Sequence, residues 1–228
     1  MTKDYLLIDG FKHYPFTPEQ FSENEILEKT ASYYTFMDKR RSVRHFSDKL
    51  IPLDIIKNII RTASTAPSGA HKQPWTFCLI QSPKIKQQIR EAAEAEEEKS
   101  YTQRMSKTWL QDLAPLGTNT DKPFLEIAPY LIVVFKKAYE IDKNGEKRQN
   151  YYVNESVGLA CGLLIAAIHN AGLVTLTHTP SPMRFLEQIL ERPSNERAFL
   201  LLPVGYPAKE VYVPAIKRKP LDKIYKIY

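Results

Sequence analysis

The most distinctive stretch of the sequence reads TAPSGAHKQPW at residues 65–75, and it continues into the apolar run WTFCLI at residues 75–80. Small residues and a glycine at the end of a helix let the backbone approach a ligand closely, with N–H groups available as donors. A tight turn into a strand is the simpler explanation. Because the stretch is long and unusual, we expect a helix, a ligand-contacting turn and a strand in succession.

Helices and short strands alternate along the rest of the chain. Ser22 and Glu25 have the spacing of a capping box and start a helix that runs to about Lys39. A second helix opens near Pro52 and Asp54. Further helices are expected after Pro83, over residues 154–171 with Gly172 as the C-cap, and over residues 183–190, and further strands over residues 130–135, 173–178 and 198–204. This order predicts an α+β fold with helices around a central sheet.

Two segments show no clean periodicity. Residues 1 to about 21 combine aromatic side chains with prolines, and we expect this arm to pack on another surface, its own or a partner's. Residues 102–126 contain Pro115, Gly117 and Pro123 and are expected to form a long irregular segment. In a compact domain such a segment is more often a lid or a binding loop than a plain connection.

Length and composition limit the class of protein. The 228 residues suit one large domain or a domain with arms, and the 43% hydrophobic and 25% charged shares are ordinary for a soluble globular protein. The longest apolar run is too short to span a bilayer, and the first residues lead into no hydrophobic stretch with a small-residue cleavage site, which argues against a secretory signal. We therefore expect no membrane association. Cys78 and Cys161 lie in separate apolar runs without metal-ligand spacing. This pattern favours two reduced thiols in the cytoplasm over a disulfide and predicts no metal site.

The net charge of +6 leaves nucleic-acid binding as a weak alternative. The basic residues are scattered, and the densest run is only residues 217–219. A bound phosphate would account for part of the excess, so we expect no nucleic-acid partner. The sequence also lacks the GxGxxG, Walker, GxSxG and HExxH motifs, which disfavours the commonest dinucleotide-binding, phosphate-hydrolysing, serine-hydrolase and zinc-protease functions.

The run RRSVR at residues 40–44 follows the first expected helix. Three guanidinium groups and a hydroxyl form a good anion cradle, because arginine presents fixed donor forks to phosphate. A solvated basic turn is the alternative. The position of the run before the Pro52 helix favours the cradle.

A carboxylate, a phenol and an ammonium form a second candidate group. Glu97 and Tyr101 are four residues apart and share a helix face, and Lys122 lies in the segment that is able to fold back over them. Together they can clamp a zwitterionic amino acid, although a solvated acidic helix face is the alternative for Glu97. The run THT at residues 177–179 ends a strand, where functional side chains are common, but threonine is also a strand former. His178 has no nucleophile or metal partner nearby in sequence and is expected either to be structural or to support a neighbouring site residue.

Taken in order, these stretches resemble the nitroreductase superfamily of flavin enzymes and, within it, the iodotyrosine deiodinases. The basic run at residues 40–44 is similar to the flavin-phosphate motif of the superfamily. The resemblance also rests on TAPSGAHxxPWTF (65–77), the set Glu97, Tyr101 and Lys122, ACG (160–162), NAGLVT (170–175) and LLPVGYPxKE (201–210). It covers about residues 36–224 and includes the spacing between the motifs.

The resemblance implies a nitroreductase-like fold, with a mostly antiparallel central sheet flanked by helices, in an intertwined homodimer. It implies that residues 1–35 form an N-terminal arm and first helix that pack on the dimer partner, that residues 36–228 form the FMN-binding domain, and that residues 97–122 form a lid. Mammalian members begin with a membrane anchor, which this sequence does not show. We therefore expect a soluble, bacterial relative.

The cofactor set implied by the resemblance is Arg40, Arg41, Ser42, Val43, Arg44, Pro67, Ser68, Thr177, His178, Thr179 and Arg218. Within it, Arg40, Ser42 and Arg218 are expected to hold the phosphate of FMN. Arg44 is expected at the pyrimidine end of the flavin, where it stabilises the negative charge of the reduced form. Residues 67–68 are expected to reach the flavin from the neighbouring subunit.

The resemblance also implies a reaction. Thr179 is the expected catalytic residue, with its hydroxyl at flavin N5, and the Ala70 N–H is expected to meet the substrate phenolate. Glu97, Tyr101 and Lys122 are expected to bind the ammonium and carboxylate and to close the lid. The implied function is FMN-dependent reductive dehalogenation of halotyrosines, 3-iodo-L-tyrosine to L-tyrosine and iodide, by stepwise electron transfer from reduced flavin. The electron donor is expected to be external, an NADPH-linked reductase.

Two alternatives stay open. A general NAD(P)H-dependent nitro or quinone reductase would turn over nitroaromatics with little dependence on Glu97 and Lys122. A non-catalytic flavin-binding protein would hold flavin without turnover. The spacing of the lid residues argues against the first alternative, and the compact flavin motif argues against the second.

Overall fold

The structure, a computed structural model, describes residues 5–228. The chain divides into two units, Met1–Arg40 and Arg41–Tyr228. The expected division into an arm of residues 1–35 and a domain of residues 36–228 stays a prediction, and the first four residues of that arm lie outside the described part.

The N-terminal unit contains a hairpin and one long helix. Its elements are β1 (Leu6–Ile8), β2 (Phe11–His13) and α1 (Glu23–Asp38). The hairpin forms in a stretch whose sequence shows no strand periodicity. Asp9 and Gly10 adopt φ angles of 50° and 83°, as a two-residue hairpin turn requires. The expected capping box is confirmed, because the Ser22 N–H donates to Glu25 Oε2 at 2.7 Å and the Glu25 N–H donates to Ser22 Oγ at 3.4 Å.

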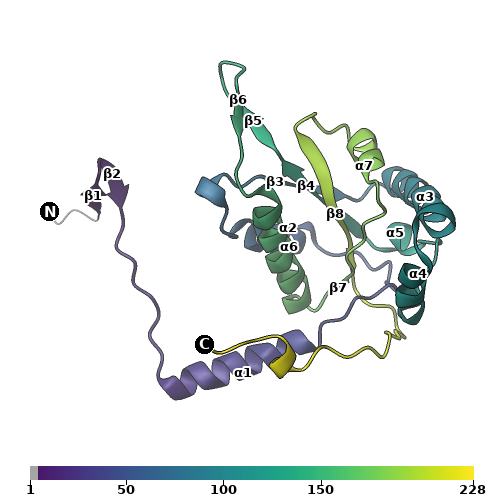
Figure 1. The fold of residues 1–228 in the computed structure, drawn as a ribbon, viewed down its shortest axis with the longest axis horizontal. Helices are drawn as coiled ribbons and strands as arrows, with labels where there is room; N and C mark the ends of the chain where they lie inside the picture. Colours follow the sequence, from purple (N-terminus) through teal and green to yellow (C-terminus); the bar gives the residue numbers. More distant parts are fainter. Residues whose placement is uncertain (1–4) are drawn as a thin grey trace. The chain divides into compact units, whose positions relative to one another are not determined.

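The larger unit is an antiparallel sheet between two layers of helices. Its elements are α2 (Leu53–Ser64), η1 (Gly69–His71), β3 (Trp75–Ile80), α3 (Pro83–Lys99), η2 (Ser100–Arg104), α4 (Lys107–Leu113), η3 (Ala114–Leu116), α5 (Phe124–Ile127), β4 (Tyr130–Lys137), β5 (Tyr139–Ile141), β6 (Lys147–Gln149), α6 (Val153–Asn170), β7 (Val174–Thr175), α7 (Arg184–Ile189), β8 (Glu196–Gly205) and η4 (Leu221–Lys223). The sheet order is β3-β4-β8-β7, and each neighbouring pair is antiparallel. Helices α2 and α6 cover one face and α3, α5 and α7 the other (Figure 1). This confirms the expected α+β fold with a central antiparallel sheet.

The central strand β4 divides its side chains between two hydrophobic cores. Those on the α2 and α6 side are Tyr130, Ile132 and Val134, and those on the α3, α5 and α7 side are Leu131, Val133 and Phe135. All of them are fully buried. Because helices cover both faces, this stretch of sequence has no polar alternation.

The strand expected over residues 173–178 is shorter in the structure, where β7 keeps only its second and third residues. The pairing register nevertheless continues to His178, which exchanges backbone hydrogen bonds of 2.9 and 3.1 Å with Leu201. In that register Leu176 lies opposite Pro203, which has no N–H to donate. The missing donor interrupts the ladder and leaves residues 177–179 as a separate segment at the end of the strand.

The segment of residues 102–126 is largely helical, which corrects the expectation of an irregular loop. The Met105 N–H donates to Ser100 O, five residues back, so the end of α3 widens into the π-helical turn η2. Ser106 then caps α4 through its side-chain oxygen. These turns are too short for a helical period to show in the sequence.

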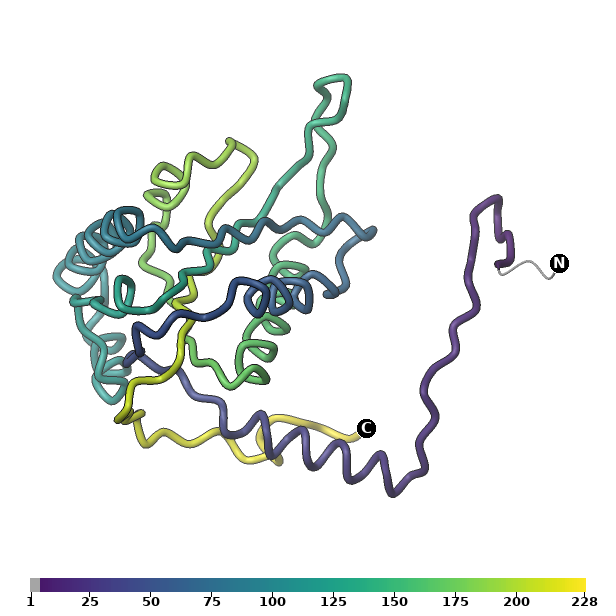
Figure 2. Tube along the Cα trace, turned by 180° about the vertical axis from the view of Figure 1, so that it is seen from behind, coloured from purple at the N-terminus to yellow at the C-terminus, as the bar shows by residue number. Residues whose placement is uncertain are grey.

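Two chain reversals in the larger unit differ in how clearly the sequence indicates them. The C-cap of α6 is Ala171, and Gly172 follows it with a φ of 71°, so the expected glycine ends the helix one residue later than the C-cap position. The hairpin β5–β6 was not expected, and Figure 2 shows it projecting from the sheet. Its turn is held by Asp142 Oδ1, which accepts hydrogen bonds from the N–H groups of Asn144 and Glu146.

Candidate active site

The basic run at residues 40–44 passes along the edge of β7. The Val43 N–H donates to Thr175 O at 3.2 Å, and Ser42 forms a parallel bridge with Thr175. Val43 is buried, whereas Ser42 is exposed and Arg44 is half-buried. Because side chains alternate along extended backbone, Ser42 and Arg44 lie on the side opposite Val43.

The C-terminal segment is joined to this run by one side chain. Arg41 Nη2 donates to Pro214 O. Arg218 lies four residues beyond Pro214 in an exposed part of the chain. Arg40 is the last residue of the N-terminal unit.

His178 is buried next to the basic residues. It is 6% exposed and lies edge-to-face against Phe124, with ring centroids 5.7 Å apart. Burial and the positive charges of Lys122 and Arg44 lower the pKa of His178 to about 3, so its ring is neutral at pH 7. Its Nε2 has no hydrogen-bond partner in the described chain. The threonines on either side of it are exposed.

The structure brings Glu97, Tyr101 and Lys122 together, as expected. Lys122 is 2% exposed, and its Nζ lies 3.6 Å from Glu97 Oε2 and 5.9 Å from the ring centroid of Tyr101. The same ammonium donates to Asn119 O. Burial raises the pKa of Glu97 and lowers that of Lys122, and the attraction between the two charges opposes both shifts. The pair therefore suits a ligand that carries one charge of each sign.

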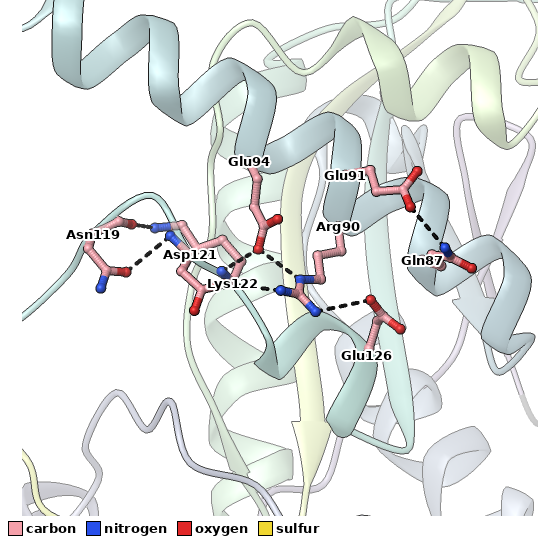
Figure 3. A network of polar contacts seen from close by, with 8 residues as sticks. All are labelled: Gln87, Arg90, Glu91, Glu94, Asn119, Asp121, Lys122 and Glu126. Carbon is pink, nitrogen blue, oxygen red and sulfur yellow. Dashed lines mark hydrogen bonds and ion pairs between the residues drawn. The ribbon is translucent and has the colours of Figure 1, made fainter.

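A network of ion pairs holds the backbone of Lys122 (Figure 3). The Lys122 N–H donates to Glu94 Oε1 at 2.6 Å, and Arg90 Nε donates to the same oxygen at 2.8 Å. Arg90 Nη2 lies 3.1 Å from Asp121 Oδ1, and Arg90 Nη1 lies 3.2 Å from Glu126 Oε1. Burial alone would raise the pKa of Glu94, but the hydrogen bonds from Arg90 and Lys122 lower it.

Sequence reasoning missed this network. The spacing of Arg90 and Glu94, four residues apart in a helix, was the available signal. Asp121 and Glu126 lie far from Arg90 in sequence, and no pattern links them to it.

A pocket of about 280 Å³ opens between the basic run and residues 117–122, the part of the expected lid that is called the lid segment from here on. Its lining includes Arg44, Phe46, Thr118, Asn119, Lys122 and Phe124. Arg44 forms no ion pair with any carboxylate of residues 5–228. The pocket therefore suits an anionic group on its Arg44 side.

The conformation of the turn η1 depends on backbone contacts that leave no room for a side chain at Gly69. The Gly69 N–H donates to Ser156 Oγ at 3.3 Å, and a Cβ at Gly69 would lie 2.7 Å from Tyr151 O. Only glycine permits so close an approach to the start of α6. Ala70 is exposed with a φ of 49°, and its N–H finds no acceptor within the described chain.

One chain does not bring all of the expected site residues together. The turn η1 and helix α4 lie at opposite ends of the Arg41–Tyr228 unit (Figures 1 and 2). Pro67, Ser68 and Ala70 belong with the turn, whereas Tyr101 and Lys122 lie on either side of α4 in sequence. The two groups are therefore separated within a single chain.

Two features are absent from residues 5–228. No helix there is long and apolar enough to cross a membrane. No group of three or more His, Cys, Asp or Glu side chains there is placed to hold a metal ion.

The chain is similar to proteins of one family. The model of the nitroreductase family matches residues 37–206. The iodotyrosine deiodinase of Haliscomenobacter hydrossis is 62% identical over 214 residues, which are 94% of this chain and 96% of that protein. Iodotyrosine deiodinase 1 of Homo sapiens is 47% identical over 219 residues, which are 95% of this chain and 75% of that protein.

A solved structure has a similar fold. The crystal structure of oxidized iodotyrosine deiodinase bound to FMN and 3-iodo-L-tyrosine matches with a TM-score of 0.73 and 31% identity. The match covers 86% of this chain and 100% of that one.

Proposed function

The chain belongs to the nitroreductase family, and from this premise we propose that it is an FMN-dependent iodotyrosine deiodinase. In the proposed reaction 3-iodo-L-tyrosine takes up two electrons and a proton and gives L-tyrosine and iodide. The observation that carries the proposal is the pair of the buried Lys122 and the half-buried Glu97, 3.6 Å apart, beside the Tyr101 ring. General reductases of small aromatics have no need for such a pair.

The pair is suited to the amino-acid end of the substrate. Lys122 offers an ammonium to the substrate carboxylate, and Glu97 offers a carboxylate to the substrate ammonium. Burial makes both protein charges poorly solvated, so a zwitterion inserted between them gains charge-assisted hydrogen bonds. Each such bond contributes roughly 1.5–3 kcal/mol, which corresponds to at least tenfold in affinity.

The other end of the substrate needs a donor for its phenolate. The exposed N–H of Ala70, which is not used inside the protein, fits this role. A backbone donor cannot lose its proton, so it favours the negative oxygen throughout. Closure of the lid segment over the substrate would exclude water and strengthen these contacts.

The donor set fits FMN. The exposed hydroxyl of Ser42 and the guanidinium groups of Arg40 and Arg218 have the chemistry that a phosphate requires. Arg44 has no carboxylate partner in the described chain, so its charge is available to the anionic reduced flavin. When bound, FMN supplies the electrons that break the carbon–iodine bond.

The segment of residues 177–179 borders the proposed flavin site. The exposed Thr179 hydroxyl makes no hydrogen bond in the described chain and is available to donate to flavin N5. The buried His178 between the threonines is neutral, so it adds no further cation beside Arg44 and Lys122.

We further propose that the active unit is a homodimer. The separation of η1 from α4 supports this, because a second copy would supply Pro67, Ser68 and Ala70 where one chain cannot. The α6 residue Leu159 is 53% exposed, as expected for a helix face that another copy covers. The proposed electron donor is an external NADPH-linked reductase.

The proposed location is the cytoplasm. The two cysteines are free, and they pack in the two cores on opposite faces of the sheet, so they cannot form a disulfide with each other. A reducing compartment accommodates such thiols.

Titration of the FMN-loaded protein with 3-iodo-L-tyrosine, followed by flavin fluorescence, tests the substrate assignment. We expect saturable quenching in the wild type that weakens about tenfold or more in Glu97→Gln. The absence of quenching, together with rapid NADPH-dependent reduction of a nitroaromatic, would assign the chain to the general nitroreductases. A protein that takes up no FMN would refute both functions.

A further inference from the structure

One face of helix α3 carries three charged residues. The last of them, Glu97, is the proposed substrate contact, and Arg90 and Glu94 lie in the preceding turns. Arg90, Glu94 and Glu97 are spaced by four and three residues, so they lie on the same face. Glu97 faces Lys122 Nζ, whereas Glu94 faces the Lys122 N–H. The helix therefore contacts Lys122 through both its side chain and its backbone.

Arg90 contacts three carboxylates, two of which lie close to Lys122 in sequence. Its guanidinium contacts Glu94 on its own helix, Asp121 immediately before Lys122, and Glu126 four residues after it. All three donor nitrogens are used, and a planar guanidinium fixes the direction of each contact. Lysine, with a single ammonium, cannot reproduce this geometry.

The far side of this segment is also held from α3. Lys86 Nζ donates to Glu126 O at 2.6 Å and to Ala128 O at 2.9 Å, at the end of α5. Lys86 is buried, so these bonds fix the end of α5 to the helix. The chain is thus attached to α3 on both sides of Lys122, through Asp121 before it and through the end of α5 after it.

Stability alone does not explain the network. Arg90 is 30% exposed, Asp121 62% and Glu126 40%, and ion pairs with this exposure contribute little to folding. Small displacements of a binding group, in contrast, have large effects on function. The network holds the backbone of Lys122, whose side chain carries the proposed binding group.

We propose that Arg90 is a positioning residue that sets the place of the Lys122 ammonium for the zwitterionic end of the substrate. The inference rests on the proposed deiodinase function. It assigns a role in substrate specificity to a residue that touches neither substrate nor cofactor.

Comparing the affinities for two ligands distinguishes a positioning role of Arg90 from a general disturbance of the site. In the FMN-loaded protein we expect Arg90→Gln to weaken 3-iodo-L-tyrosine binding about tenfold. Binding of 2-iodophenol, which has the ring but no zwitterion, should stay unchanged. Arg90→Lys should recover only part of the loss. Equal weakening of both ligands, or of neither, would overturn the proposal.

The matched control lies one residue away. Glu91 pairs with Gln87 on the exposed side of the same helix and does not contact the lid segment (Figure 3). Glu91→Gln should leave the affinity for both ligands unchanged. In a Lys122→Met background, Arg90→Gln should cause no further loss, because the group that it positions is gone. A further loss there would contradict the proposed role.

A measurement without substrate distinguishes failure of this inference from failure of the proposed function. If the wild type binds no 3-iodo-L-tyrosine, the deiodinase function is wrong, and amide hydrogen exchange then decides the role of Arg90. We expect exchange of residues 117–122 to accelerate about tenfold in Arg90→Gln relative to Glu91→Gln. Equal exchange in the two variants would overturn the positioning role.

Discussion

The turn at residues 67–71 and the lid segment at residues 117–122 are both proposed to contact the substrate, yet different forces hold them. The turn depends on backbone shape, because Gly69 packs against Tyr151 O with no room for a Cβ. The lid segment depends on charge, through Arg90 and its three carboxylates. Steric exclusion does not respond to pH or salt, whereas ion pairs respond to both. We therefore expect the two ends of the proposed site to fail under different conditions.

The largest expected effect is acid destabilisation through His178, which is buried near Lys122 and Arg44. His178 has a pKa of about 3 in the folded protein and an ordinary value near 6.5 when unfolded. The unfolded state therefore takes up a proton first as pH falls, and the stability that is complete above pH 6.5 is lost progressively towards pH 3. The loss should approach about 1.4 kcal/mol per pH unit in the free energy of unfolding.

Urea unfolding of the wild type and His178→Gln between pH 7 and pH 4.5 measures this loss. The carboxylate contributions are common to both proteins, so the difference in slope reports His178. Identical slopes would show that His178 is not a buried neutral group.

An intermediate effect is expected at the turn. Gly69→Ala places a Cβ against backbone and should lower the free energy of unfolding by about 1–3 kcal/mol. Ala70→Gly is the matched change in the same turn, because Ala70 already has a left-handed φ of 49° that glycine adopts freely. It should be neutral or slightly stabilising. Equal destabilisation by both changes would mean that the turn is not limited by backbone shape.

A smaller effect is expected from the lid charge itself. Lys122→Met should weaken 3-iodo-L-tyrosine binding about tenfold and leave FMN affinity unchanged, because the ammonium is proposed to contact only the substrate. Lys99→Met removes an exposed lysine that pairs with Glu96 on the last turn of α3, and it serves as the control. Calorimetric titration measures both affinities. If Lys99→Met weakened the substrate equally, net charge and not the lid would explain binding.

The elements that the sequence predicted well have local causes. The capping box of Ser22 and Glu25, the glycine after α6 and the apolar stretch of β4 each depend on residues close in sequence. The deviations have local causes too, but of kinds that periodicity does not detect. The β1–β2 hairpin follows from the Asp9-Gly10 turn signal, which the aromatic and proline content of the arm concealed.

Other features depend on residues that are distant in sequence. Nothing near β7 indicates its early end, because the cause is Pro203 on the neighbouring strand. The network of ion pairs around Lys122 likewise joins α3 to a segment about thirty residues away, which no periodicity detects. The helical spacing of Glu97 and Tyr101 predicts that they share a face, and the resemblance supports placing Lys122 beside them.

The central claim is that the reduced, FMN-loaded chain removes iodide from 3-iodo-L-tyrosine. The most direct measurement is a single turnover: the anaerobic protein is reduced with dithionite, freed of excess reductant and mixed with 3-iodo-L-tyrosine, and flavin absorbance and iodide are followed together. We predict reoxidation of the flavin with release of stoichiometric iodide and formation of L-tyrosine. A flavin that stays reduced with 3-iodo-L-tyrosine, yet is oxidised at once by a nitroaromatic, would contradict the account.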